Sequence, residues 1–565
     1  MSDNLYQKLS EERKKLQAEG LMPEWWSTGG WQLFKEKYLY QADNPYEQYM
    51  RIARTLAAHT KDPETWSRKF FDVMWKGWLS PSTPVLANTG TTRGMPVSCA
   101  GSYLDDSIFG IYRGKQETAM LTKYGFGTSS YLGDIRPRGS EIFGGGKSSG
   151  ILPIIEGFQK DMEYVSQGTA RRGSWAGYVP IDHGDFSEVV TYLEQNPDGN
   201  NIGWNVSNAF IDRLVARDPE ALHRYAKALK TKMVTGKGYF FFPDKVNAKR
   251  PKWYVDHNLD VKAAQLCNEI TLHSSIDYTY TCVLASMNVV HYRDWKDTDA
   301  VQTATVFLDC VAQEFIERAK NIRGLERAVA FTKKSRALGL GVCGLHSLFQ
   351  QEMMPFESLE AHMLNQEIFR HIRAEAETAT KQIAEWWGEP EWCKGYGRAN
   401  SHLLAVAPTK STALIMGGVS EGINPDTAMV FTQRTAGGEV DRVNPYLLKL
   451  MKQKGVYTKK NVEEVREAMG SVQRVSWLTD DEKAVFKTAF EINQHVIIRM
   501  AAARGKYIDQ WQSLNLFFSA GEDESYINDV HREAFMNPDI LGLYYVYSMA
   551  GVQASNDKNE CVACQ

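Results

Sequence analysis

The amino-acid sequence predicts an α/β fold, and three observations support this prediction. Between residues 210 and 400, segments with the periodicity of amphipathic helices alternate with short apolar segments such as residues 238–242 and 282–290. Glycine and small hydroxyl residues are concentrated between residues 85 and 210, as expected for connecting loops. The chain has 565 residues, of which 43% are hydrophobic, so it can bury a large core.

The first 80 residues are predicted to form a helical region. Asp62, Pro63 and Glu64 are typical of a helix start, with an N-cap, a proline in the first turn and an acidic residue. Aromatic and apolar residues follow at helical spacing. Pro81 and Pro84 then end the helix and begin an extended segment. We therefore expect a helical region at 1–80, a large α/β domain at 81–548 and a flexible tail at 549–565.

Composition argues against several classes of protein. The formal net charge of −3 does not indicate bulk binding to nucleic acid or to a membrane. The N-terminus lacks a basic segment followed by an apolar one, and no run of 18 apolar residues occurs. Eight cysteines are too few for a disulfide scaffold in so long a chain. We expect a cytoplasmic protein with reduced thiols.

Three short motifs are weak indications of a ligand site. Residues 339–344 fit GxGxxG without a clear βαβ unit, and residues 141–148 fit a P-loop except that Glu141 replaces the first glycine. Cys561 and Cys564 form a single CxxC pair without the second pair that a zinc site requires. Two adjacent thiols on a flexible tail favour thiol–disulfide exchange instead, and no metal site is predicted.

The segment Gln265-Leu266-Cys267-Asn268-Glu269 brings an amide, a thiol and a carboxylate close together in the sequence. Alternate residues of an extended segment share one face, so Gln265, Cys267 and Glu269 are predicted to point into one space. The segment resembles the finger loop of class I ribonucleotide reductase large subunits, whose pattern is Asn-x-Cys-x-Glu. Gln265 departs from that pattern, because glutamine is longer than asparagine by one methylene.

Other motifs follow in the order of this family. They are Pro96-Val97-Ser98-Cys99 with Asp105-Asp106-Ser107-Ile108, the segment from Thr281 and Cys282 to Asn288, Pro408-Thr409-Lys410-Ser411-Thr412, Tyr544-Tyr545, and Cys561 with Cys564. The resemblance runs from about residue 45 to the end of the chain. It implies a ten-stranded α/β barrel of two five-stranded halves, with the Cys267 loop threaded through the centre.

The resemblance also implies a radical mechanism. A thiyl radical at Cys267 would abstract the 3′-hydrogen of a ribonucleoside diphosphate, and Glu269 would act as general base on the 3′-hydroxyl. Cys99 and Cys282 would supply the reducing equivalents and become a disulfide. Gln265 completes the catalytic set. Buried apolar cysteines are the structural alternative for the redox pair.

Radical supply and turnover would depend on partner proteins. The resemblance implies that the radical comes from the metal cofactor of a small (beta, R2) subunit, through Tyr544 and Tyr545, with no cofactor tightly bound in this chain. An aromatic core pair is the structural alternative for the tyrosines. Cys561 and Cys564 would reduce the disulfide and be reduced in turn by thioredoxin or glutaredoxin.

Substrate and effectors would bind at separate sites. Small hydroxyl residues at an expected helix start favour phosphate binding, and the resemblance implies a substrate site with Thr83, Ser98, Pro408, Thr409, Lys410, Ser411 and Thr412. The implied effector site comprises Asp106, Ser107, Ile108, Gln167 and Arg171, with ATP, dATP, dTTP and dGTP as effectors. We expect a homodimer. The N-terminus is too short for the family's ATP-cone, so no dATP inhibition through a cone is expected.

Two other functions compete with this interpretation. An adenosylcobalamin-dependent class II reductase would make its radical without the tyrosine pair. A nucleotide-binding relative inactivated at Gln265 would keep the fold without turnover. A glycyl-radical class III enzyme is disfavoured, because the end of the chain offers two shuttle cysteines and no obvious radical glycine.

Overall fold

The computed structural model describes residues 2–167, 171–435 and 438–548. Its N-terminal part is helical, as predicted. The elements are α1 (Ser2–Ala18), α2 (Thr28–Leu33), the π-helix η1 (Phe34–Tyr38), α3 (Pro45–Ala57) and α4 (Pro63–Trp75). Asp62 is the N-cap of α4 and accepts a hydrogen bond from the Thr65 amide, with Pro63 in the first turn. The prediction of a helix start at this point is confirmed.

The first half of the barrel is a parallel sheet of five strands. These are β2 (Cys99–Tyr103), β3 (Gly127–Tyr131), β6 (Trp175–Pro180), β7 (Asn201–Asn205) and β8 (Tyr239–Phe241), paired in that order. Helices connect successive strands: α6 (Ile108–Lys123), α7 (Leu152–Tyr164), α8 (Phe186–Gln195), α9 (Asn208–Val215) and α10 (Pro219–Thr235). Parallel neighbours require such crossovers, which explains the alternating pattern of the sequence.

The second half is built around β9 (Tyr280–Asn288), a strand of nine buried residues. It runs antiparallel to β2 and to β1 (Leu79–Pro81), and parallel to β10 (Leu338–Cys343). Beyond β10 the sheet continues through single parallel bridges, Leu340 to Leu404 and Val406 to Gln512, rather than through long strands. The helices of this half include α14 (Ala300–Ala319), α15 (Glu326–Ser335), α17 (Leu359–Trp387) and α22 (Gln494–Gly505).

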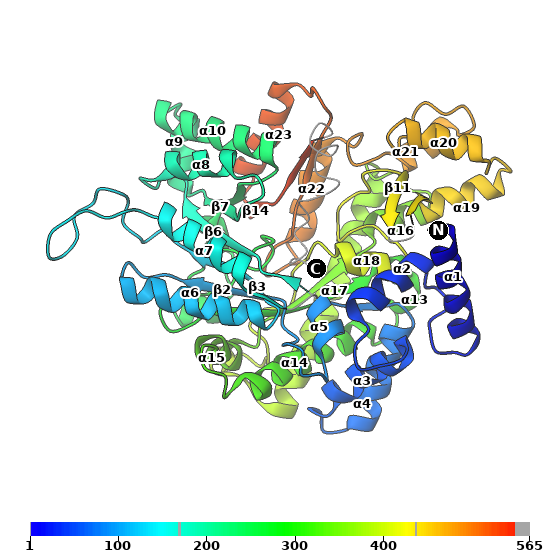
Figure 1. Ribbon diagram of the computed structural model, residues 1–565, viewed down its shortest axis with the longest axis horizontal. Helices are drawn as coiled ribbons and strands as arrows, with labels where there is room; N and C mark the ends of the chain where they lie inside the picture. The colour runs from blue at the N-terminus through cyan, green and yellow to red at the C-terminus, as the bar shows by residue number, and fades with distance from the viewer. Residues whose placement is uncertain (1, 168–170, 436–437, 549–565) are drawn as a thin grey trace.

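The predicted α/β barrel with a helical N-terminal region is therefore confirmed. Within the described residues the main sheet has nine strands, because β14 (Gly542–Leu543) adds antiparallel to β8. In Figure 1, α6–α10 lie on the left of the view, α14 and α15 lie below them, and the N-terminal helices α3 and α4 lie beside α14 at the lower right. The remaining elements are α5 (Thr83–Asn88), β4 (Ser166–Gln167), β5 (Arg171–Arg172), α11 (Pro243–Ala248), α12 (Lys252–Asp256), η2 (Val289–His291), α13 (Tyr292–Trp295), α16 (Leu345–Gln351), η3 (Glu391–Cys393), α18 (Lys410–Ile415), β13 (Leu516–Phe518), α23 (Glu524–Met536) and β15 (Val546–Ser548).

A small lobe with its own hydrophobic cluster was not anticipated from the sequence. It comprises β11 (Val430–Thr435), β12 (Gly438–Val443), α19 (Pro445–Gln453), α20 (Lys459–Glu467) and α21 (Asp480–Val485). Met429, Leu447, Met451 and Val465 are among its buried residues. Figure 1 shows the lobe at the right-hand end of the molecule, next to α1.

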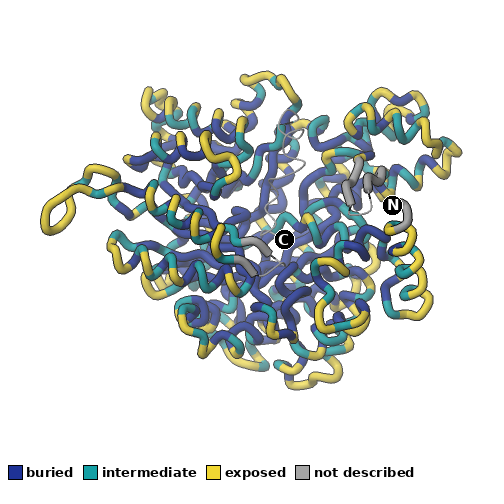
Figure 2. Tube along the Cα trace, in the orientation of Figure 1, coloured by how far each residue is buried: buried dark blue, intermediate teal, exposed yellow. Residues whose placement is uncertain are grey.

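The centre of the barrel is buried, whereas one long segment projects into solvent. Figure 2 shows a buried interior. Residues 261–274 have no regular secondary structure, and all of them except Lys262 are buried. The segment between β3 and α7 instead extends away from the body, and its Phe143 is fully exposed. The irregular central segment carries Cys267.

Candidate active site

Gln265, Cys267 and Glu269 lie at the centre of the barrel, and each is at most 1% exposed. The sequence predicted an extended segment here, but the structure shows a turn. Asn268 has a φ of 70°, and its amide donates to the Gln265 carbonyl at 3.0 Å, which closes a tight turn. A left-handed residue of this kind is most readily Asn or Gly. The turn, rather than strand alternation, brings the side chains of Gln265 and Glu269 together.

Gln265 connects the other two residues of the motif. Its Nε2 donates to the Glu269 carboxylate, and its Oε1 accepts a 2.8 Å hydrogen bond from the Cys267 amide. The Tyr178 hydroxyl donates to the Gln265 carbonyl at 2.7 Å and fixes the start of the turn. The longer side chain at this position therefore reaches both the carboxylate and the backbone of the cysteine.

Glu269 is held in an environment that favours its protonated form. Burial raises the pKa of Glu269 to about 8, against the opposing hydrogen bonds from Ser513 and Gln265. The Ser513 hydroxyl lies 3.2 Å from Glu269 Oε2, whereas Oε1 is buried and has no hydrogen-bond partner among the described residues. An unsatisfied buried oxygen is costly unless a ligand supplies the missing donor. Glu269 is therefore suited to exchange a proton with a bound hydroxyl group near neutral pH.

Cys99 and Cys282 are directly opposite residues on the antiparallel strands β2 and β9. Both are buried and neither forms a disulfide. Opposite residues of an antiparallel pair have Cα atoms about 4.5–5.5 Å apart, which lies within the range of about 4.4–6.8 Å that a disulfide requires. Burial raises the pKa of the Cys282 thiol, so it is protonated at neutral pH.

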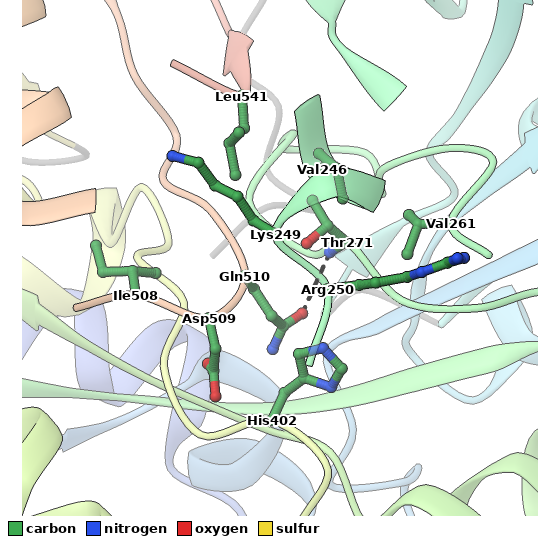
Figure 3. A pocket seen from close by; sticks show the side chains of 10 residues that line it. All are labelled: Val246, Lys249, Arg250, Val261, Thr271, His402, Ile508, Asp509, Gln510 and Leu541. Carbon is green, nitrogen blue, oxygen red and sulfur yellow. Dashed lines mark hydrogen bonds between the residues drawn. The ribbon is translucent and has the colours of Figure 1, made fainter. Parts of the chain in front are cut away.

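Gln510 connects Cys282 to the central turn. Its Nε2 lies 3.6 Å from Cys282 Sγ and 2.8 Å from the Leu338 carbonyl, and its Oε1 accepts from the Thr271 amide at 3.2 Å. Figure 3 shows Gln510 with Thr271 and His402 around a cavity of about 20 Å³, room for about one water molecule. Burial lowers the pKa of His402 to about 4, so this ring is neutral.

Tyr544 and Tyr545 are in contact, with ring centroids 4.2 Å apart. Tyr239 on β8 packs against both, at 4.8 Å from Tyr544 and 5.5 Å from Tyr545, and its hydroxyl lies 3.3 Å from that of Tyr545. Tyr544 is buried and Tyr545 is partly exposed. The pair adjoins the central turn, because Asn268 Nδ2 donates to the Leu543 carbonyl at 3.3 Å.

The predicted phosphate loop begins a helix, as expected. Thr409 is the N-cap of α18 with a φ of 58°, and its Oγ1 accepts from the Gly422 amide at 2.8 Å. Lys37 Nζ on η1 lies 3.3 Å from Ser411 Oγ. Of the two other predicted substrate residues, Thr83 contacts the Tyr38 hydroxyl at 2.9 Å and Ser98 donates to Ser82 Oγ at 2.8 Å.

The predicted effector residues fall on two separate elements. Ser107 is the N-cap of α6, next to the exposed Ile108, and Asp106 pairs with Arg136 at 2.5 Å. Gln167 and Arg171 are opposite residues of the β4–β5 pair, some distance along the chain from α6. Cys561 and Cys564 lie outside the described residues.

Five residues in contact with these groups were missed in the sequence: Lys232, Tyr239, Asn268, Gln510 and Ser513. Ser513 donates to the Cys267 carbonyl at 2.7 Å as well as to Glu269. Gln510 and Ser513 belong to residues 508–515, a mixed polar and apolar segment in which Gln510, Gln512, Ser513 and Asn515 are all buried. The sequence does not show that burial, so it gave no signal for these two residues. Among the described residues, no group of three or more His, Cys, Asp or Glu side chains is arranged to hold a metal ion. No described helix is long and apolar enough to span a bilayer.

Comparison with known proteins identifies the family. The barrel-domain model of ribonucleotide reductase matches residues 97–222, 220–392 and 377–546, and the all-alpha domain model matches residues 27–94. A Frog virus 3 protein named as a ribonucleoside-diphosphate reductase large subunit is 34% identical over 531 residues, covering 88% of this chain and 92% of that protein. The large subunit from Invertebrate iridescent virus 3 is 28% identical, with coverage of 95% and 98%.

A solved structure agrees with both sequence comparisons. The alpha subunit of the Actinobacillus ureae class Id ribonucleotide reductase superposes with a TM-score of 0.87 at 38% identity, and covers 94% of this chain and 99% of that subunit. The residues that match the barrel-domain model include the finger turn, the opposed cysteines and the tyrosine pair. This chain belongs to the family of class I ribonucleotide reductase large subunits.

Proposed function

We propose that this large subunit reduces ribonucleoside diphosphates to 2′-deoxyribonucleoside diphosphates through a thiyl radical at Cys267. The observation that carries the proposal is the placement of Cys267 and Glu269 in one buried turn, with the Cys99–Cys282 pair on the adjoining strands. Loss of a ribose hydroxyl requires an activated sugar, a general base and two reducing equivalents, and these residues are the types that supply them.

The proposed chemistry balances within this set of residues. The Cys267 thiyl radical takes the 3′-hydrogen, and Glu269 accepts the 3′-hydroxyl proton while the 2′-hydroxyl leaves as water with a proton from the cysteine pair. Cys99 and Cys282 give up two electrons and two protons in all and become a disulfide. One of these protons leaves with the water, and the other hydrogen is delivered to C2′. Cys267 then returns its hydrogen to C3′ and Glu269 returns its proton to the 3′-oxygen, which yields the deoxynucleotide and restores the thiyl radical and the Glu269 carboxylate.

The substrate would lie between the central turn and the start of α18. Thr409, Ser411 and Thr412 offer hydroxyl groups, and Lys410 offers a cation to the diphosphate. Pro408 precedes this loop, and Thr83 and Ser98, the residue directly before Cys99, would complete the substrate site. Substrate reduction would therefore combine residues from both halves of the barrel.

The radical would enter from a separate small (beta, R2) subunit, whose metal cofactor generates it. Tyr545 is the more exposed of the tyrosine pair and would face that partner, while the buried Tyr544 would pass the oxidation toward Cys267. Cys561 and Cys564 would reduce the Cys99–Cys282 disulfide by exchange, and thioredoxin or glutaredoxin would restore the tail. With these partners we expect the enzyme to act in the cytoplasm.

Specificity would be set by effector nucleotides at a dimer interface. The first turns of α6 expose Ile108, Phe109 and Tyr112, which are 75%, 74% and 65% exposed. An apolar patch of this kind favours association with another protein surface, and a homodimer would bring effector-contacting Asp106 and Ser107 to the interface. Gln167 and Arg171 would transmit the identity of ATP, dATP, dTTP or dGTP to the substrate site.

The test is reduction of CDP with ATP or dTTP and a thiol reductant, with a radical-generating small subunit added or omitted. We expect deoxynucleotide only when that subunit is present, and none from Cys267→Ser or Tyr545→Phe. Turnover with adenosylcobalamin alone would assign the chain to class II chemistry. Effector binding without turnover from any radical source would indicate an inactive relative.

A further inference from the structure

Lys232 is a buried cation next to the tyrosine pair. It lies in the last turn of α10 and is 0% exposed. Its Nζ donates to the carbonyl of Gly238 at 3.2 Å and to the carbonyl of Tyr544. No carboxylate in the described part of the chain forms an ion pair with it. A lysine in this setting is costly to bury, so its hydrogen bonds must compensate for lost hydration.

The two carbonyls belong to the two chain segments that hold the tyrosines. Gly238 precedes Tyr239 at the start of β8, and Tyr544 lies between β14 and β15. The Lys232 ammonium is 5.8 Å from the centroid of the Tyr239 ring and 5.6 Å from that of Phe240, which is a cation–π distance. Lys232 therefore links the backbone of Tyr544 to the strand whose Tyr239 contacts both tyrosines.

The charged and titratable groups around Lys232 offer it no counter-ion. His531 on α23 is fully buried, and its Nδ1 donates to the Ile527 carbonyl at 2.8 Å. Burial, and then the charge of Lys232, lower the pKa of His531 to about 4, so this ring is neutral. On α8, Glu194 pairs with Lys227 rather than with Lys232. Burial lowers the pKa of Lys232 itself to about 7.

A second buried lysine, Lys245, has a structural role as the cap of a helix. Lys245 Nζ donates to the carbonyls of Ala534, Phe535 and Asn537, at 3.1, 2.7 and 2.8 Å. Those carbonyls are at the C-terminal end of α23, so Lys245 caps that helix. Burial lowers the pKa of Lys245 to about 7 as well. Lys232 instead bonds to two carbonyls beside the tyrosines, neither of which belongs to a helix.

We propose that Lys232 is a positioning residue for radical transfer, which holds the Tyr544 backbone against β8 and so sets the contact between Tyr544, Tyr545 and Tyr239. The proposal rests on the proposed function of the tyrosine pair. Electron transfer between two rings depends steeply on their separation, so a small displacement of Tyr544 slows the step from Tyr545 to Tyr544. Binding of substrate and effectors at other sites is independent of this contact.

The experiment compares Lys232→Met with Lys245→Met in the full-length chain assayed with the small subunit. We expect Lys232→Met to lower kcat for CDP by about tenfold or more, as for a displaced reacting group, with KM and dTTP binding unchanged. Lys245→Met should lose comparable stability on thermal unfolding and keep kcat within about twofold. Turnover of folded Lys232→Met within twofold of the parent would overturn the proposal.

A spectroscopic measurement locates the affected step. Replacing Tyr545 or Tyr544 by 3-aminotyrosine, which is easier to oxidise, allows the radical at each position to be counted by EPR. In Lys232→Met we expect an undiminished radical at position 545 and a smaller yield at position 544. Equal yields at both positions would overturn the positioning role. No radical at either position in the parent protein would instead reject the proposed radical pathway itself.

Lys232→Gln covers the case in which the methionine variant does not fold. Glutamine keeps a buried donor but is too short to reach both carbonyls. We expect its radical yield at position 544, relative to position 545, to be lower than that of the parent. A parent-like ratio in folded Lys232→Gln would overturn the proposal.

Discussion

Cys99 and Cys282 face each other across two antiparallel strands that join the two halves of the barrel. The pairing places both thiols at the seam between β2 and β9, where the backbone hydrogen bonds of both strands restrict movement. A disulfide could therefore form with little displacement of the backbone. The seam is also next to the central turn, because Gln510 contacts both Cys282 and the Thr271 amide.

This geometry predicts a single turnover without an external reductant. Pre-reduced protein with Cys561→Ser and Cys564→Ser, mixed with substrate, effector and small subunit, should make about one deoxynucleotide per chain. Peptide mapping should then find Cys99 joined to Cys282. Cys310→Ala, a substitution at a buried cysteine in α14, is the matched control and should behave like its parent. Repeated turnover by Cys282→Ala under these conditions would contradict the redox role.

The tail cysteines predict a dependence on the reductant. Cys561→Ser should lose turnover driven by thioredoxin or glutaredoxin, because the exchange route to the buried disulfide is interrupted. Turnover driven by a small dithiol, which can reach the site directly, should persist at a measurable rate. The comparison is made as initial rates with each reductant for the parent, Cys561→Ser and Cys564→Ser. Equal loss with both reductants would mean that the tail has another role.

The raised pKa of Glu269 predicts how activity changes with pH. A general base must be deprotonated, and with a pKa of about 8 Glu269 is mostly protonated in the free enzyme at pH 7. We expect kcat/KM for CDP to rise about tenfold per pH unit below pH 8 and to level off above it. The assay should hold the small subunit in excess, and effector binding measured over the same pH range is the control. A flat profile from pH 6 to pH 9 would exclude Glu269 as the base.

The same pKa predicts that the stability of the fold falls as pH rises, whereas activity rises. The unfolded value is about 4.3, so between that pH and about 8 the folded chain holds a proton that the unfolded chain has released. Burial of Glu269 therefore destabilises the fold increasingly as pH rises through this window. Glu269→Gln should raise the thermal midpoint at pH 8.5 by a few degrees more than at pH 5.5. Glu64→Gln, at an exposed helix position, should show no such difference.

The sequence predicted the types of element better than the local geometry of the site. Strands at residues 238–242 and 282–290 and the helix start at Asp62 follow from periodicity and capping, and they agree with β8, β9 and α4. The extended conformation around Cys267 was wrong, because local alternation does not reveal a turn at Asn268 that long-range contacts stabilise. Contacts from Ser513 or Lys232, which lie far from the turn in sequence, cannot be read from any local pattern.

The small lobe around Met429 and Leu447 shows a second limit of the same kind. Its helices are short and amphipathic, so each is visible in the sequence. Whether they add to the main core or form a separate one depends on the path of the chain between them. The site residues stay a prediction from the order of the family motifs, and the two hydrogen-bond partners of Gln265 are visible only in the structure.

Gln265 provides the most specific prediction. Its side chain bonds simultaneously to the Cys267 amide and to the Glu269 carboxylate. Asparagine is shorter by one methylene and can satisfy only one of the two partners from the same backbone position. A lost hydrogen bond to a buried charged group costs about 1–3 kcal/mol, or roughly 5–150-fold in rate if it acts in the transition state. We expect Gln265→Asn to lower kcat by about tenfold and Gln265→Ala by more, in single-turnover reduction of CDP.

The pH dependence of kcat/KM for Gln265→Ala should also show a higher apparent pKa for Glu269, because the amide hydrogen bond of Gln265 favours the charged carboxylate. If the parent is inactive and Gln265→Asn gains turnover, then glutamine blocks the site rather than organising it, and the chain is a nucleotide-binding relative that has lost its activity.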